Sequence, residues 1–319
     1  MLRSLLIYLS KAHWAQRLVT RWGLAWRAAS RFIAGTKIED AIRVIRELNA
    51  RGINVTLDHL GEHTSSTEEA SDATLAIIRT LGALKKSGLC ANVSIKLSQI
   101  GLGLDEQICR QNLERILAKA REYHNFVRID MEDTPYTDQT LSLCRELRRK
   151  GYRQVGVALQ SYLYRTEADA RALLADKTPI RLVKGAYQEP ASKAFPKKAD
   201  VDANFDLLSK LMLDAASAPR APRGSPDGCI PPIPAIGTHD PKRIEFAIQY
   251  AGKIGLPKNA FEFQMLYGIR RDLQEQLRKD GFSVRVYVPF GTHWYPYFMR
   301  RLAERPANLW FFISNFLRK

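Results

Sequence analysis

The 319-residue chain is long enough to bury one large core, and its 45% apolar content fits a single globular domain. The net charge of +16 favours anionic partners, but it does not distinguish nucleic acid, a lipid surface and acidic metabolites. The absence of a run of about 18 apolar residues argues against a membrane-spanning helix. The four cysteines have neither CxxC nor zinc-ligand spacing, so we expect no disulfide framework and no metal site, and a reducing compartment fits best.

The N-terminal stretch is strongly basic. Residues 1–38 hold seven Lys and Arg residues and no acidic residue, and the apolar run before Lys11 is too short for a secretory signal. Tryptophans interleaved with arginines fit a membrane-surface helix, a transit peptide, or a helix packed on the main domain with a solvated basic face. We expect a basic helical segment over residues 1–50, packed on or beside a barrel that occupies residues 51–319.

After this segment, short apolar runs alternate with amphipathic stretches. The runs, each interpreted as a strand, are 53–60, 92–98, 126–132, 154–160, 180–186, 233–238, 261–266 and 284–290. Most intervals are 23 to 39 residues; the exception, before residue 233, contains the Pro-rich insert 217–234, where we expect a mobile loop. Eight such units without a Gly-rich dinucleotide fingerprint predict a (β/α)8 TIM-type barrel rather than an open doubly wound sheet.

Polar residues end nearly every predicted strand, where a barrel of this kind places its active site. They are Asp58, Glu62, Lys96, Ser98, Asp130, Glu132, Gln160, Arg181, Lys184, Thr238, His239, Gln264 and Tyr287. Strand alternation predicts that Asp130 and Glu132 share one face. Any one of these residues could belong to a structural pair, but polar groups at all eight strand ends favour a functional site.

The eighth strand leads through a short turn into a helix that we expect to begin near Pro296 and to lie over the barrel mouth. Tyr297, Arg300, Arg301 and Glu304 fall on one face of this helix. Two neighbouring guanidiniums bind a carboxylate or phosphate well. The alternative is a solvated basic face with Glu304 as an ordinary intrahelical partner.

Several stretches, in this order, resemble one family: "NVSIKLSQIG", "RIDMED", "GVALQSYLYR", "IRLVKGAY", "GTHD", "EFQMLYG" and "VPFGTHWYPYFMRRLAE". They lie within residues 53–305 and closely resemble the FAD-dependent proline dehydrogenases of the monofunctional bacterial type. One departure is Asp240, where the family often has Asn. The insert 217–234 and residues 1–38 are not part of the match.

The resemblance implies roles for particular residues. It implies two catalytic residues, Asp130 and Arg181, with Arg181 at the reactive edge of the flavin. We also expect Asp130 to be a charge partner of Lys96, because an unpaired buried cation would be costly. The implied substrate site has a carboxylate clamp of Lys96, Arg300 and Arg301, with Tyr287, Leu266 and Tyr297 around the ring, and Glu304 supporting one arginine. The implied flavin contacts are Met131, Gln160, Lys184, Gly185, Ala186, Thr238 and His239.

The implied reaction is hydride transfer from C5 of L-proline to FAD, giving Δ1-pyrroline-5-carboxylate, with electrons passed from FADH2 to a quinone. This is the first step of proline degradation. We expect a cytoplasmic protein without nucleic-acid partners, and we leave open peripheral contact with the anionic inner face of the membrane.

Three alternatives stay open at this point. The first is a Schiff-base lyase on the same barrel that uses Lys96 or Lys184 as its nucleophile. The second is a non-enzymatic basic module that binds nucleic acid or lipid. The third is a folate-reducing flavin barrel, against which the paired arginines favour a compact amino-acid carboxylate.

Overall fold

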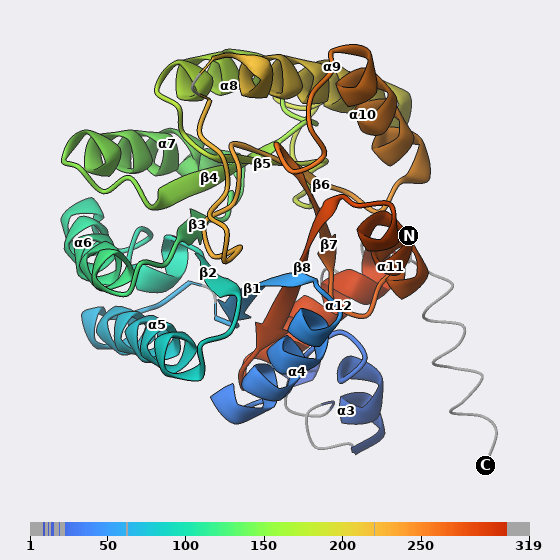
Figure 1. Ribbon diagram of the computed structural model, residues 1–319. Helices are drawn as coiled ribbons and strands as arrows, with labels where there is room; N and C mark the ends of the chain where they lie inside the picture. Colours follow the sequence, from blue (N-terminus) through green and yellow to red (C-terminus); the bar gives the residue numbers. More distant parts are fainter. Residues whose placement is uncertain are drawn as a thin grey trace.

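The structure, a computed structural model, describes residues 9, 12, 14, 15, 19, 23–61, 63–219 and 221–304, with backbone alone at residues 23, 24 and 304 (Figure 1). Most of the basic N-terminal stretch, Glu62 and the side chain of Glu304 therefore lie outside the described residues. Among the helices described, none is both long and apolar enough to cross a membrane.

Parallel strands close into a barrel, in which each strand pairs with the next along the chain and β8 pairs with β1. The strands are β1 (Asn54–His59), β2 (Ala91–Ile95), β3 (Val127–Ile129), β4 (Val155–Gln160), β5 (Ile180–Val183), β6 (Pro234–Gly237), β7 (Glu262–Leu266) and β8 (Ser283–Phe290). The predicted TIM-type barrel is confirmed. Most strands are shorter than predicted, and three of them stop well before the predicted end: β2 before Lys96, β3 before Asp130 and β5 before Lys184.

Helices surround the barrel and connect its strands (Figure 1). They are α3 (Gly23–Ala29), α4 (Ile38–Ala50), α5 (Thr67–Ser87), η1 (Ser98–Ile100), α6 (Glu106–Glu122), α7 (Thr134–Arg149), α8 (Thr166–Ala175), α9 (Lys198–Ser217), α10 (Pro241–Lys253), α11 (Arg271–Lys279) and α12 (Trp294–Glu304). Local chemistry sets several of their starts: Asp105 accepts from the amides of the first turn of α6, and Asp240 does the same for α10. The last helix begins at Trp294, two residues before the predicted start at Pro296.

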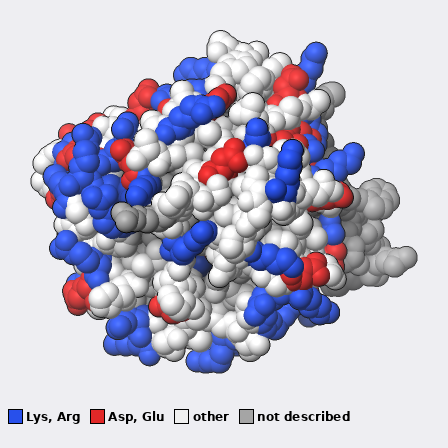
Figure 2. All heavy atoms as spheres, turned by 45° about the horizontal axis from the view of Figure 1, so that its top comes forward, with Lys and Arg blue, Asp and Glu red and all other residues white. Residues whose placement is uncertain are grey.

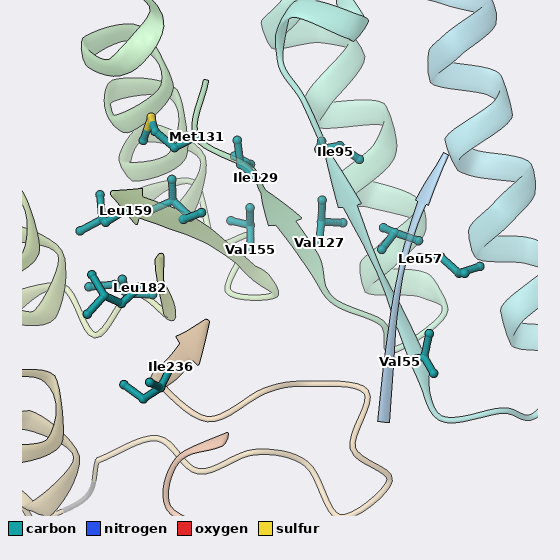
Figure 3. Packing of buried hydrophobic residues seen from close by; sticks show 14 of the residues in the cluster. Val55, Leu57, Ile95, Val127, Ile129, Met131, Val155, Leu159, Leu182 and Ile236 are labelled. Atoms are coloured by element: carbon teal, nitrogen blue, oxygen red, sulfur yellow. The ribbon is translucent and has the colours of Figure 1, made fainter. Parts of the chain in front are cut away.

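The main core lies between the strands and their helices. Apolar residues that alternate along each strand, such as Val55 and Leu57 on β1 and Val127 and Ile129 on β3, are fully buried there (Figure 3). Helix α4 adds its apolar stripe to the same cluster, so the end of the predicted N-terminal segment packs on the barrel. The division of the chain at residue 50 stays a prediction.

The interior of the barrel is polar. Arg181 on β5 contacts Gln264 on β7, and Tyr287 on β8 contacts Asp130, which directly follows β3. These strands are not neighbours, so such contacts are possible only across the barrel interior. Charged residues there are almost fully buried, with Arg128, Glu262 and Arg285 each 1% exposed. Burial of so many charges requires partners, because an unpaired buried charge is costly.

The Pro-rich insert crosses the N-terminal end of the barrel. The backbone carbonyl of Cys229 accepts a hydrogen bond from Asn92 Nδ2 at 2.8 Å, and that of Gly228 accepts from Arg285 Nη2 at 2.5 Å. Asn92 and Arg285 lie near the starts of β2 and β8. The insert is thus anchored to the barrel interior where the sequence predicted a mobile loop.

Candidate active site

Four polar side chains meet inside the C-terminal half of the barrel. Asp130, directly after β3, accepts hydrogen bonds at Oδ1 from Arg181 Nη1 and from Ser94 Oγ, both at 2.6 Å. Its Oδ2 accepts a hydrogen bond from Tyr287 Oη at 2.8 Å. The Arg181 guanidinium also lies 5.3 Å from the centre of the Tyr287 ring. The structure therefore brings together the two residues predicted to be catalytic and one that was predicted to enclose the substrate ring.

A chain of buried hydrogen bonds holds the other side of Arg181. Its Nε donates to Gln264 Oε1, and Gln264 Nε2 donates to Glu262 Oε1. Glu262 Oε1 also accepts from Arg285 Nε at 2.8 Å. The chain connects the N-terminal half of the barrel interior with the mouth, and it fixes the plane of the Arg181 guanidinium.

Lys96 lies directly after β2, and its Nζ is 3.4 Å from Asp58 Oδ2. The sequence predicted Asp130 as its charge partner, but the structure pairs Asp130 with Arg181. The reason lies in the register of the barrel: Asp58 on β1 is the direct neighbour of Ser94, two residues before Lys96. Asp58 is therefore the acidic group closest to Lys96 on the interior face.

Tyr287 connects these two ion pairs. Burial raises the pKa of Tyr287 well above its usual range, and the negative charges of Asp130 and Asp58 raise it further. The phenol therefore stays protonated at neutral pH. It donates its hydrogen bond to Asp130 and lies close to Asp58. The polar groups at the mouth form one connected system.

Asp130 and Glu132 do not share one set of partners, contrary to the prediction from strand alternation. Because β3 ends at Ile129, Glu132 lies in the following loop, where it accepts from the amide of Ser98 at 3.0 Å. Burial raises the pKa of Glu132, although hydrogen bonds from Ser98 oppose this effect. The carbonyl of Glu132 accepts from Gln160 Nε2 at 2.9 Å, which fixes the loop that carries Met131.

Helix α12 carries the predicted clamp. The Arg301 guanidinium lies 5.1 Å from the centre of the Tyr297 ring, and both side chains are buried, which confirms that they share a face. Arg300 is half-buried. The helix follows β8 after a short turn and packs in one apolar cluster with α3 and with Leu60, which follows β1. It therefore lies at the C-terminal end of the barrel, whereas the predicted support by Glu304 involves a side chain outside the described part.

The predicted flavin contacts line the ends of β3 to β6. Met131, Gln160 and Thr238 are buried, Lys184, Gly185 and His239 are partly exposed, and Ala186 is exposed. Lys184 Nζ makes ion pairs with Asp202 and, at 2.6 Å, with Asp240. His239 Nε2 accepts from the amide of Leu266 at 2.8 Å, so a neutral His239 carries its proton on Nδ1.

Gly185 shows why this loop needs a glycine. Its φ of +116° lies in the region that side chains rarely adopt, and a Cβ atom would lie 2.3 Å from the Tyr162 ring. The chain after β5 can therefore turn closely past Tyr162 and leave Lys184 facing Asp202 and Asp240.

Sequence reasoning missed several residues of this system. Asp58 and Gln264 were noted only as polar strand ends, and Ser94, Glu262 and Asp202 were not noted as site residues. Ser94 and Glu262 could have been found from alternation, since each lies two positions from a polar residue on the same strand. Asp202 gave no such signal, because it lies on α9, far from Lys184 along the chain.

Comparison with known proteins now decides the family. The family model described as proline dehydrogenase matches residues 41–313. The chain belongs to the proline dehydrogenase family. Its predicted resemblance is thus confirmed, and the match begins within α4 and extends through α12.

Similar proline dehydrogenases align over nearly their full lengths. The chain is 43% identical over 298 residues to proline dehydrogenase of Deinococcus radiodurans, covering 92% of this chain and 91% of that protein. It is 39% identical over 318 residues to proline dehydrogenase 2 of Bacillus subtilis, covering 99% of each. Against the bifunctional protein PutA of Escherichia coli, the identity is 26% and the alignment covers only 23% of that protein.

A solved structure shares the fold. Proline utilization A from Bdellovibrio bacteriovorus, inactivated by N-propargylglycine, superposes with a TM-score of 0.79 at 26% identity and covers 88% of this chain. This chain spans about a third of that structure, since 33% of it is matched.

Proposed function

We propose that the protein oxidises L-proline to Δ1-pyrroline-5-carboxylate, with FAD bound at the C-terminal mouth of the barrel and a quinone as the electron acceptor. The observation that carries the proposal is the connected system of Asp130, Arg181 and Tyr287 at the mouth of a barrel of this family. FAD supplies the hydride acceptor, which no protein side chain provides.

The residues at the mouth fit a flavin. Met131 offers buried apolar surface for a flat ring system, and Arg181 brings a permanent cation that its hydrogen bonds hold in place. Positive charge at the reactive edge would favour the anionic reduced form of the cofactor. Lys184 and His239 lie farther along the mouth, where they suit the polar chain and the phosphates.

The substrate site combines two parts of the chain. Lys96, Arg300 and Arg301 would bind the proline carboxylate, and Tyr287, Leu266 and Tyr297 would enclose the ring. The buried Arg301 would give a strong charge-assisted contact, because it is shielded from water. Asp130 holds Arg181 and Tyr287, so we assign it a positioning role rather than that of a general base.

The Schiff-base alternative is less well supported. A lysine nucleophile must be available as a free amine. Lys96 instead pairs with Asp58, and Lys184 lies between Asp202 and Asp240. Both lysines suit the role of fixed cations.

The function is tested by assaying purified protein for FAD released on denaturation and for proline-dependent formation of Δ1-pyrroline-5-carboxylate with a soluble quinone. We expect both FAD and product. Protein that contains no FAD and takes up none, or FAD-loaded protein that leaves proline unchanged, would refute the proposal.

The clamp is tested by R300M and R301M. Loss of one partner of a buried charge-assisted contact costs roughly 2 to 5 kcal/mol, which corresponds to a fall in kcat/KM of about 30-fold to several thousand-fold. The control is R171M, because exposed Arg171 pairs with Glu167 on its own helix. If R300M and R301M keep the efficiency of R171M, the clamp is wrongly assigned.

We place the enzyme in the cytoplasm, with peripheral contact to the inner face of the membrane. The net charge of +16 supports attraction to an anionic surface, and a lipid-soluble quinone would be met there. Co-sedimentation with anionic vesicles at rising salt concentration measures this contact.

A further inference from the structure

A cleft of about 370 Å³ lies at the N-terminal side of the barrel, away from the candidate active site. It is bounded by the C-terminal turn of α7, the turn that leads into β4, and the turn after α8. Its lining residues are Arg145, Arg148, Arg149, Arg153, Ala175, Asp176 and Lys177. Nothing in the proposed reaction uses this cleft.

The cleft has a large excess of positive charge, since five cations face one carboxylate. That carboxylate, Asp176, is already engaged by Arg145, with Nε and Oδ2 2.8 Å apart. Within the described part of the chain, Arg149, Arg153 and Lys177 make no ion pair with a carboxylate. Figure 2 shows a dense group of basic side chains at the left of the molecule, the side on which Figure 1 places α7.

Several cations on the neighbouring surface form ion pairs with carboxylates. Lys150, next to the cleft, pairs with Glu114 at 2.7 Å and with Glu146 at 3.3 Å. Arg110 also pairs with Glu146, and Arg165 pairs with Asp169. These three neighbouring cations are paired with carboxylates, whereas Arg149, Arg153 and Lys177 of the cleft are not, within the described part of the chain.

Arg148 forms the floor of the cleft and is only 5% exposed. Its guanidinium donates to the carbonyls of Arg153 and Val155 at 2.9 Å and to that of Lys177 at 2.9 Å, while its Nε has no hydrogen-bond partner among the described residues. Burial lowers the pKa of Arg148, and the nearby charge of Arg153 adds to this. The carbonyls satisfy the two terminal nitrogens of the guanidinium, but among the described residues no carboxylate forms an ion pair with this buried cation.

The backbone carbonyls at the end of α7 are already engaged. The backbone carbonyls of Glu146, Arg148 and Leu147 accept hydrogen bonds from the backbone amides of Lys150, Gly151 and Tyr152, respectively. Gly151 makes this possible with a φ of +98°. An anion in the cleft would therefore meet side-chain cations rather than free carbonyl oxygens.

We propose that this cleft is a binding site for a phosphate group that carries more than one negative charge. The planar guanidinium of arginine matches the oxygens of a phosphate group, and several arginines converge here around a concave space. The volume of the cleft, about 370 Å³, is near the lower limit of about 300 Å³ for small-ligand sites. The cations gather around two turns rather than along an extended groove, which favours a compact group over a nucleic-acid strand. The phosphate could belong to a soluble polyphosphate compound or to a lipid headgroup.

The test is isothermal titration of the purified, FAD-loaded protein with sodium tripolyphosphate at constant ionic strength. We compare wild type with R149Q/R153Q, which removes two exposed cleft cations, and with K85Q/K86Q, which removes two exposed cations from the end of α5. Saturable binding in wild type that weakens at least about tenfold in R149Q/R153Q and not in K85Q/K86Q supports the site. Proline oxidation should be unchanged in both variants and reports on folding.

A second arm identifies the source of the phosphate. Phosphatidylcholine vesicles with and without phosphatidylglycerol are sedimented with the same three proteins. If tripolyphosphate does not bind but the anionic vesicles retain wild type and K85Q/K86Q more than R149Q/R153Q, the headgroup is the source and the site stands. Absence of binding in both arms, or equal losses in the two double variants, overturns the proposal.

Discussion

Arg181 has a defined place because three different side chains accept from it or support it. Asp130 accepts a hydrogen bond from Arg181 Nη1, Gln264 accepts one from Arg181 Nε, and the Tyr287 ring lies against the guanidinium. A cation fixed in this way needs no reorganisation when negative charge develops beside it, which is the basis of electrostatic stabilisation.

We expect R181M to lower the reduction potential of the bound FAD and to reduce kcat by about 10²–10³-fold, as loss of one charge-stabilising donor typically does. Q264L should have a smaller effect in the same direction, because it frees one side of Arg181 while keeping the charge. R181K is the matched control, since it preserves the charge without the fork. The measurement is spectroelectrochemical titration, and an unchanged potential in FAD-loaded R181M would contradict the assignment.

Asp206, near Lys184, gives a pH prediction. Burial raises its pKa to about 6, and the nearby Asp202 and Asp240 add to this, although Arg243 lies 2.7 Å away and opposes it. Because the folded-state pKa is above the ordinary value, this group favours the folded state most at low pH and loses that contribution as pH rises through about 6. Relative to wild type, D206N should therefore gain stability between about pH 4 and pH 7.

Urea unfolding of both proteins across this range measures the difference. A stability difference between D206N and wild type that does not change with pH would show that Asp206 titrates normally.

The elements were predictable where a repeating pattern encoded them. Apolar runs at regular intervals gave all eight strands and the barrel, because each strand buries an apolar face against its helices. The ends of elements were less predictable: β3 stops before Asp130 and α12 begins at Trp294, since loop contacts rather than periodicity set these limits.

Within the site, the residues were better predicted than their partners. The grouping of Asp130, Arg181 and Tyr287 followed from strand ends and family resemblance. The pairing of Lys96 with Asp58 depends on strand register, which one sequence does not determine. The anchoring of the insert could not be predicted either, because it uses backbone carbonyls, which carry no sequence signal.

Arg285 joins the insert to the barrel, so its substitution tests how much this connection stabilises the fold. It bonds Glu262, the carbonyl of Val55 and the carbonyl of Gly228 while 1% exposed. R285M should cost about 3 to 5 kcal/mol of unfolding free energy, since it leaves the buried carboxylate of Glu262 without its cation.

The double variant E262Q/R285M distinguishes charge from packing. Because it removes both buried charges, it should be more stable than R285M in urea unfolding. If the double variant is less stable by the sum of the two single losses, the two residues act independently and the ion pair is not what stabilises this end of the barrel.

At the scale of the whole molecule, the barrel separates two kinds of site. The C-terminal end gathers Asp130, Arg181 and the proposed clamp on α12, where barrels of this architecture place their chemistry. The N-terminal end is closed by the insert and bears the cationic cleft beside α7. The basic character of the chain thus has a local component at the end opposite to the candidate active site.

The central claim is that proline reduces FAD bound at the mouth of this barrel. The most direct measurement is an anaerobic titration of the FAD-loaded protein with L-proline, without quinone, followed by flavin absorbance. We predict that proline bleaches the oxidised flavin and that added quinone restores it. Retention of the full flavin absorbance at saturating proline, in protein shown to contain FAD, would contradict the claim.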